Sequence, residues 1–150
     1  MSRGLGWVQQ ACLQVISEYE AEGDELPTTY SITAAVYEVK PDKNGNRWVN
    51  DAQHVAVKRA LGGLQRKGRI IGFRTQRAVV PGVDGRPELC HHWMTERRAQ
   101  KFVKDELKAA VESRHMGFRG NTDLADGVVK KMKAIGMKVC LLYTSPSPRD

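Results

Sequence analysis

The sequence predicts a mostly α-helical protein with one small β-hairpin. Apolar residues recur every three or four positions at the start, in the middle and near the end of the 150-residue chain, as they do along amphipathic helices. Two runs typical of strands, residues 69–77 and 88–95, follow the central helical stretch and flank a loop rich in proline and glycine, residues 78–87. No apolar run approaches the roughly 20 residues that a membrane span needs.

The first two helices are expected at residues 5–22 and 31–39. Gly23 supplies the stop of the first helix, and the residue before Pro27 is pushed into an extended conformation, which predicts a connector between the two. The inward face of the first helix comprises Leu5, Val8, Ala11, Cys12, Val15, Ile16 and Tyr19. The inward face of the second comprises Ile32, Ala35, Val36 and Val39. We expect Cys12 to be a buried small hydrophobe.

Residues 50–69 contain the central helix. Asn50 and Gln53 have the spacing of a capping box, and Gly68 stands where a left-handed C-cap residue is expected. The inward stripe is Val57, Ala60, Leu61 and Leu64. At 100° per residue the outward face collects Asp51, Val55, Lys58, Arg59, Gly62 and Arg66, with His54 near its edge. A polar loop, residues 40–47, precedes the helix, and Trp48 is expected to be a hydrophobic staple or a loop anchor.

Two more helices are expected after the hairpin. Thr95 and Glu96 start the first of them, and residues 113–120 break it. Residues 121–123 cap the last helix, which ends at Gly136. Their expected inward residues are Ala99, Phe102, Val103, Leu107, Ala110 and Val111, then Leu124, Val128, Met132 and Ile135. Trp93, on the second strand, is expected in the core.

The positive charge gathers in the middle of the chain. The formal net charge is +7. Residues 1–39 carry one cation and six carboxylates, net −5, whereas residues 40–77 carry ten cations and two carboxylates, net +8. Residues 78–139 carry twelve cations and eight carboxylates, net +4. Such a concentration is the electrostatic footprint expected for phosphate binding, although a solvated basic surface is an equally simple interpretation.

Catalytic and metal-binding patterns do not emerge. Cys90, His91 and His92 are adjacent on a strand, so they point to alternate faces and cannot all converge on one ion. The sequence has no glycine-rich phosphate loop, no nucleophile elbow and no HExxH motif, so we expect neither an enzyme nor a cofactor. The N-terminus lacks the apolar region of a signal peptide and cysteines are few, so a cytoplasmic protein is expected.

The last eleven residues, 140–150, resemble the in-frame translation of a sequencing-library adapter. They read CLLYTSPSPRD and carry no helical or strand periodicity. We therefore expect a non-native tail, a natural chain that continues beyond Val139, and no role for Cys140 in a disulfide or metal site.

The order of a helix, a short helix, a basic helix, a hairpin and a further helix resembles the winged helix-turn-helix fold of bacterial and phage DNA-binding regulators. The likeness lies in residues 32–37, ITAAVY, and residues 57–70, VKRALGGLQRKGRI, and it covers roughly residues 5–95. It implies a winged helix-turn-helix domain at residues 1–95 and a helical extension at residues 96–139. The loop at residues 40–47 is longer than the tight turn of the simplest members.

The resemblance implies sequence-specific binding of double-stranded DNA, with regulation of transcription as the expected role. The central helix would lie in the major groove and the hairpin loop, or wing, would touch the backbone or minor groove. Groove-facing positions would be Asn50, His54, Val55, Lys58 and Arg59, although His54 is more simply a surface residue. Phosphate contacts would be Arg66, Arg74, Arg77 and Arg86.

Other interpretations stay open. The winged domain could mediate protein contacts, in which case its basic face would tolerate neutralisation. It could also be the DNA-binding part of a larger replication or mobile-element protein cut short at Val139. RNA binding is the weakest alternative, because no aromatic pair sits on an exposed strand. The apolar stripes of residues 96–139 could pair two copies of the chain over a palindromic site.

Overall fold

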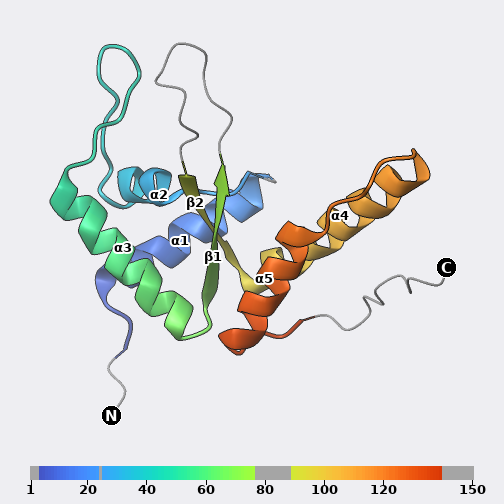
Figure 1. The fold of residues 1–150 in the computed structure, drawn as a ribbon. Helices are drawn as coiled ribbons and strands as arrows, with labels where there is room; N and C mark the ends of the chain where they lie inside the picture. Colours follow the sequence, from blue (N-terminus) through green and yellow to red (C-terminus); the bar gives the residue numbers. More distant parts are fainter. Residues whose placement is uncertain (1–3, 24, 77–88, 140–150) are drawn as a thin grey trace. The chain divides into compact units, whose positions relative to one another are not determined.

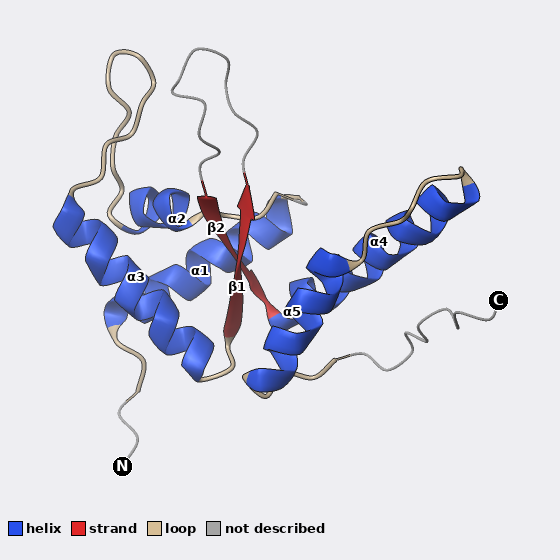
Figure 2. Cartoon of the chain, in the orientation of Figure 1, coloured by secondary structure: helices blue, strands red, loops and turns tan. Residues whose placement is uncertain are grey.

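The computed structural model describes residues 4–23, 25–76 and 89–139. Within these ranges the chain forms five helices and one two-stranded antiparallel sheet, which confirms the predicted mostly α fold with a small hairpin (Figure 1, Figure 2). The chain divides into two compact units after Thr95. Of the described elements, the first unit holds three helices and the hairpin, and the second holds two helices.

Helix α1 (Trp7–Glu22) supplies one wall of the core of the first unit. It starts two residues later than predicted, because Gly6 is extended. Gly23 ends it as predicted, and the Gly23 N–H donates to the Tyr19 carbonyl at 3.2 Å. Its buried residues are Cys12, Val15 and Ile16. Burial raises the pKa of the Cys12 thiol to about 11, so the thiol stays protonated and behaves as the predicted small hydrophobe.

Helix α2 (Thr29–Val36) starts two residues earlier than predicted. Thr28 and Ser31 form a capping box: the Ser31 N–H donates to Thr28 Oγ1 at 3.1 Å, and the Thr28 N–H donates to Ser31 Oγ at 2.8 Å. The helix also ends three residues early, because Glu38 takes a left-handed conformation with φ of 49°. The predicted start was too late because Thr28 and Thr29 were expected to belong to the extended connector.

The inward side of α2 differs in part from the predicted one. Its buried residues are Thr29, Ile32, Thr33 and Ala34. Of the four predicted positions, only Ile32 is fully buried, and the half-buried ones are Ala35, Val36 and Val39. Burial of Thr33 is tolerated because its hydroxyl donates to the Thr29 carbonyl at 2.7 Å, so no polar group is left unsatisfied.

Helix α3 (Asp51–Arg66) agrees with its prediction at both ends and along its stripe. The Gln53 N–H donates to Asn50 Oδ1 at 2.8 Å, and the Asn50 N–H donates back to Gln53 Oε1 at 3.3 Å, which completes the capping box. Gly68 is left-handed, with φ of 70°, and follows the last turn. The buried residues are the predicted Val57, Ala60, Leu61 and Leu64.

Strands β1 (Ile70–Gln76) and β2 (Leu89–Thr95) pair antiparallel, with Ile70 opposite Thr95. Both predicted strands are correct to within one residue at each end. The loop that joins them, residues 78–87, lies outside the described residues.

Trp93 fixes the hairpin against the helices. Its side chain is 5% exposed, as a core residue should be, and its indole N–H donates to Thr29 Oγ1 at 2.8 Å. Gly72 lies opposite Trp93 on β1, and a Cβ atom there would come within 2.6 Å of the indole ring. The Gly72 N–H donates to Gln65 Oε1 at 2.8 Å, so the same point of β1 is also tied to α3.

The second unit is an antiparallel pair, α4 (Glu96–His115) and α5 (Asp123–Ala134) (Figure 1). Its buried helix residues are Ala99, Val103, Leu107, Ala110, Ala125, Val128 and Met132. The predicted inward faces of α4 and α5 were too wide, since Val111 and Leu124 are exposed. Two helices packed only against each other bury a narrow row of side chains on each. Two other residues predicted to face inward, Phe102 and Ile135, are half-buried. Helix α4 ends at His115, within the predicted break at residues 113–120, and α5 ends at Ala134, before the left-handed Gly136.

Candidate nucleic-acid interface

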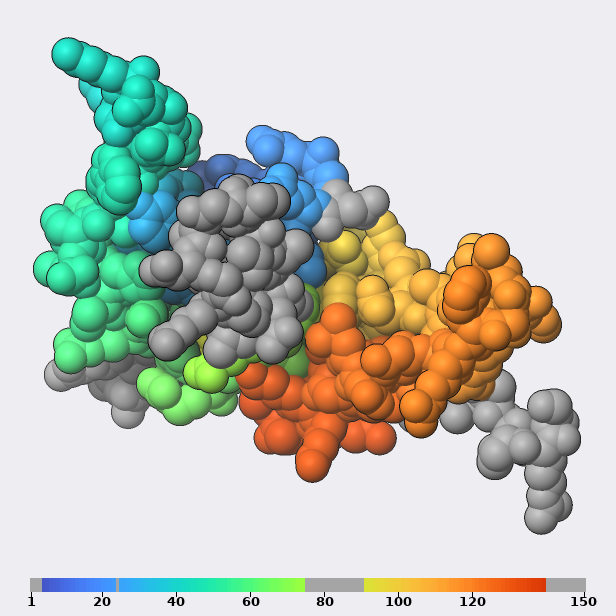
Figure 3. Space-filling model, turned by 45° about the horizontal axis from the view of Figure 1, so that its top comes forward, coloured from blue at the N-terminus to red at the C-terminus, as the bar shows by residue number. Residues whose placement is uncertain are grey.

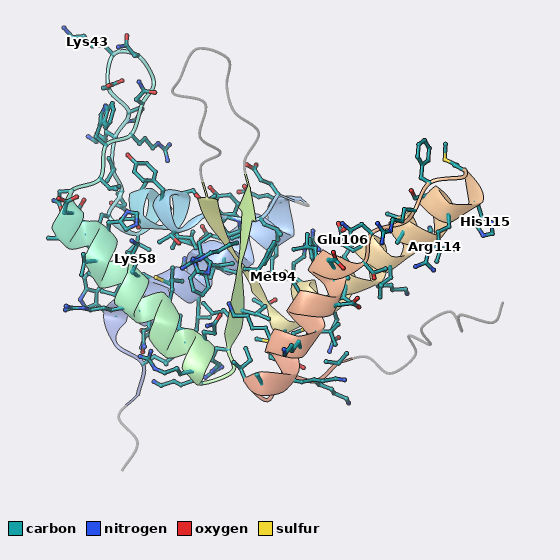
Figure 4. The ribbon with its side chains drawn as sticks, viewed as in Figure 1. Lys43, Lys58, Met94, Glu106, Arg114 and His115 are labelled. Atoms are coloured by element: carbon teal, nitrogen blue, oxygen red, sulfur yellow. The ribbon has the colours of Figure 1, made fainter. Side chains whose placement is uncertain are left out.

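The outward face of α3 is exposed and basic. Lys58 and Arg59 lie near the middle of the helix and Arg66 near its C-terminal end, and all three side chains are exposed (Figure 4 labels Lys58). They lie on the side of α3 away from the stripe that packs into the core. A row of cations held on a fixed helix face creates a positive potential that attracts a polyanion.

Near the C-terminal end of this face, Gly62 has no side chain, which leaves room for the side chain of Arg66. A Cβ atom on Gly62 would lie 3.6 Å from a guanidinium nitrogen of Arg66, so the Arg66 side chain lies back along the helix over Gly62. The guanidinium therefore stays close to the helix surface, where it can reach a phosphate at the edge of a groove.

The N-terminal positions of the predicted interface are less available. Asn50 is exposed, but its Oδ1 accepts the Gln53 N–H, so the helix cap uses one of the two lone pairs of that oxygen and fixes the direction of the amide. Val55 is 44% exposed and offers an apolar surface. His54 is half-buried, and its ring centroid lies 6.3 Å from that of Tyr30.

His54 adds no positive charge near neutral pH. Burial lowers its pKa from the ordinary value of 6.5, and the charge of Lys58 lowers it further, against an opposing effect of Asp51. The imidazole is therefore neutral at pH 7, with one donor and one acceptor nitrogen.

A groove lies between α3, the first turn of α2 and the hairpin. Helix α3 lines it with His54, Lys58, Gly62 and Gln65, and the hairpin lines it with Arg74, His91 and Trp93. The start of α2 and its connector contribute Glu25, Leu26, Thr28, Thr29, Tyr30 and Ser31. Lys58 and Arg74 place positive charge on two walls, and the Glu25 carboxylate opposes them. The groove thus brings together three of the predicted site residues, namely His54, Lys58 and Arg74.

Tyr30 and Gln65 are among the groove residues that the sequence did not predict as part of the site. Tyr30 reaches the groove because α2 starts early, and the signal for that start is the spacing of Thr28 and Ser31. Gln65 lies between the buried and outward sides of α3 and is held by the N–H of Gly72. The hydrogen bond between Gln65 and Gly72 joins α3 to β1, and no local pattern in the sequence indicates it.

Two predicted phosphate contacts, Arg77 and Arg86, lie outside the described residues. Arg74 is exposed on β1.

The histidine pair on β2 points to two sides of the hairpin. The His91 ring stacks on Trp93, with centroids 4.8 Å apart, whereas the His92 ring stacks on Phe73 at 5.7 Å. Phe73 is the cross-strand partner of His92. Among the residues that the structure describes, no group of three histidine, cysteine or acidic side chains is placed to hold a metal ion.

In the described part of the chain, no helix is both long enough and apolar enough to cross a membrane. No protein-family model, no curated protein and no solved structure matches this chain.

Proposed function

We propose that this chain binds double-stranded DNA through the outward face of α3 and the groove beside it. One observation carries the proposal: Lys58, Arg59 and Arg66 are exposed on a helix whose opposite stripe is buried. Core packing therefore fixes the face of the helix from which the cations project. An α-helix with its side chains is about 10–12 Å across, which fits the major groove of about 12 Å.

The proposed contacts divide into two kinds. Lys58 and Arg59, near the middle of α3, are placed to reach base edges, whereas Arg66 and Arg74 would bind phosphates and fix the orientation of the protein. Arg77 and Arg86, in and near the hairpin loop, are proposed as further phosphate contacts. Regulation of transcription is the role that this proposal takes from the resemblance to winged helix-turn-helix regulators.

Fluorescence anisotropy with a labelled duplex pool, over a series of salt concentrations, tests the proposal. Arg66→Ala should weaken binding to all sequences alike and lower the log–log salt slope by about one unit, because one phosphate contact is lost. Arg59→Ala should cost about 1–3 kcal/mol on the preferred sequence alone if its guanidinium reads a base.

Lys104→Ala supplies the matched control, because Lys104 is an exposed lysine on α4, in the second unit and not among the residues of the proposed site. Its affinity and salt slope should equal those of the parent. A parent chain with no salt-dependent affinity for duplex DNA would contradict the proposal and favour a protein-interaction module, whose partners would then be sought with the same variants.

We further propose that residues 96–139 pair two copies of the chain. Support comes from the turn after α4, where Met116 and Phe118 are 75% and 67% exposed. Neighbouring exposed apolar side chains can form a contiguous patch, and such patches often mark an interaction surface. Sedimentation equilibrium should give the mass of a dimer for the parent, and Phe118→Ser should shift the equilibrium toward the monomer. A parent that stays monomeric at the concentrations used for DNA binding rules this pairing out.

A further inference from the structure

The loop between α2 and α3 has a defined conformation, held by internal hydrogen bonds, although its residues are exposed to solvent. All residues from 40 to 48, named here the 40–48 loop, are exposed. Figure 1 and Figure 3 show this loop, in teal, standing out from the first unit beyond the start of α3. An exposed loop gains little from hydrophobic burial, so its shape must come from polar bonds and turn geometry.

Asp42 organises the loop. Its Oδ1 accepts the N–H groups of Asn44 and Asn46 at 2.8 and 2.9 Å, and its Oδ2 accepts the indole N–H of Trp48 at 2.8 Å. These bonds, led by the one from Trp48, lower the pKa of Asp42, so the carboxylate stays ionised. The turn closes at Gly45, which has φ of 80° and donates its N–H to the Asp42 carbonyl at 3.0 Å.

Tyr30 ties the loop to the rest of the first unit. Its hydroxyl donates to the Arg47 carbonyl and accepts the Val49 N–H at 3.3 Å. Tyr30 also lines the groove that contains Lys58, and it lines a second hollow together with Arg47 and Trp48. The loop surface and the groove beside α3 therefore meet at Tyr30.

The groups that the loop presents to solvent suit a polyanion. Lys40, Lys43 and Arg47 are exposed, and Figure 4 shows Lys43 at the tip of the loop. The single carboxylate of the loop, Asp42, directs its oxygens to the internal bonds described above. Trp48 is 70% exposed and is held by its N–H edge, which leaves an indole face in solvent beside the cations.

We propose that the 40–48 loop is a second DNA-binding arm, which contacts phosphates flanking the base pairs covered by α3. This inference rests on the proposed DNA binding and extends it. The loop leads directly into the N-cap of α3, so the cations Lys43 and Arg47 continue the basic surface past the N-terminal end of that helix. Because the loop is already ordered, little conformational entropy is lost when it binds.

The test compares the full parent chain with the double variant Lys43→Ala/Arg47→Ala. Both substitutions leave the backbone bond to Tyr30 and the bonds of Asp42 in place, so the loop keeps its shape. The matched control is Lys104→Ala/Lys108→Ala, which removes two exposed cations from α4. Circular dichroism and thermal unfolding of all three proteins establish that they are equally folded.

The first measurement is the salt dependence of binding to a duplex selected by the parent and long enough to carry flanks. Each phosphate contact contributes about 0.9 to the log–log slope, so the double variant should lose about two units. Between 50 and 200 mM salt the affinity of the parent should therefore fall roughly tenfold more than that of the double variant. The control should match the parent.

Ethylation interference locates the contacts. Ethylation of certain phosphates outside the α3-covered base pairs should block the parent, and this interference should disappear with the double variant while the inner positions stay unchanged. The indole N–H signal of Trp48, assigned with Trp48→Phe, should shift when the parent binds the long duplex. The signal of the buried Trp93 should move less.

The outcomes separate the two proposals. If the parent binds duplex DNA but the double variant has the same slope and the same interference pattern, the arm is refuted and the α3 interface stands. If the parent binds no duplex at all, both are refuted. If a polyglutamate peptide at equal charge shifts the Trp48 signal as strongly as DNA does, the loop recognises acidic protein segments and the arm is again refuted.

Discussion

A single methyl group at Gly72 should loosen the hairpin from the helices. In Gly72→Ala the new Cβ would lie 2.6, 2.8 and 2.9 Å from three ring carbons of Trp93. Carbon atoms in van der Waals contact are about 3.5–4.0 Å apart, so either the ring or the strand must move by about 1 Å.

The magnitude follows from how Trp93 is held. The indole is 5% exposed, and its N–H donates to Thr29 Oγ1, so the ring cannot move without straining the core or losing that bond. Overpacking in a core costs about 1–3 kcal/mol, and a buried donor left without its acceptor costs about 1–3 kcal/mol more. We expect Gly72→Ala to lower the free energy of unfolding by about 2–6 kcal/mol.

Urea unfolding followed by tryptophan fluorescence measures this loss, since Trp7, Trp48 and Trp93 all lie in the first unit. Gly62→Ala is the control in the same unit: its Cβ would meet only an Arg66 nitrogen at 3.6 Å, and alanine favours the helix by about 0.5–1 kcal/mol. If Gly72→Ala unfolds at the same urea concentration as the parent, the indole does not lie over Gly72.

Three further predictions concern α2 and α3. Leu64→Ala should lower the free energy of unfolding by about 2–5 kcal/mol in urea, because Leu64 is fully buried; an unchanged midpoint would mean that α3 is rotated. Glu38→Gly should raise the free energy of unfolding by about 0.5–1 kcal/mol. Glycine relieves the strain of the left-handed φ of 49° and loses part of that gain through the greater entropy of the unfolded chain. His54 has a folded pKa below its ordinary 6.5, so the unfolded chain binds the proton more readily and stability falls as pH drops through 6.5. His54→Gln should therefore flatten the stability profile below about pH 6.5, and a variant with the profile of the parent would refute this assignment.

Helix α3 could be predicted from the sequence because everything that defines it is local. The capping box joins Asn50 to Gln53, three residues apart, and the apolar stripe repeats within four turns. The stop at Gly68 depends on one residue that adopts a left-handed φ without strain. Helix α2 was harder, because both Thr28 and Ser31 can begin a helix and only their pairing decides which one caps it.

The groove could not be predicted, because its walls come from distant parts of the chain. Thr29 and Trp93 are 64 residues apart and are joined by one hydrogen bond, and this bond sets the distance between α2 and the hairpin. Periodicity assigns a residue to the inward or outward side of its own element. It carries no information on which other element stands opposite, so Tyr30 and Gln65 could not be placed in the groove.

The packing of α3 also limits which bases it could read in the proposed complex. The cap of α3 holds the Asn50 amide through one lone pair of its oxygen, at the N-terminal end of the helix, and His54 is half-buried beside Tyr30. The polar groups left near the middle of the face are Lys58 and Arg59, which donate hydrogen bonds and accept none. Guanine presents two acceptors, O6 and N7, in the major groove, whereas adenine is usually read by an amide that both donates and accepts. Duplexes selected from a random pool by the full chain should therefore be enriched in guanine at the central positions, and Arg59→Ala should abolish that enrichment at one of them. Selection of adenine-rich sites with no guanine requirement would show that Lys58 and Arg59 bind phosphates, and that the bases are read elsewhere.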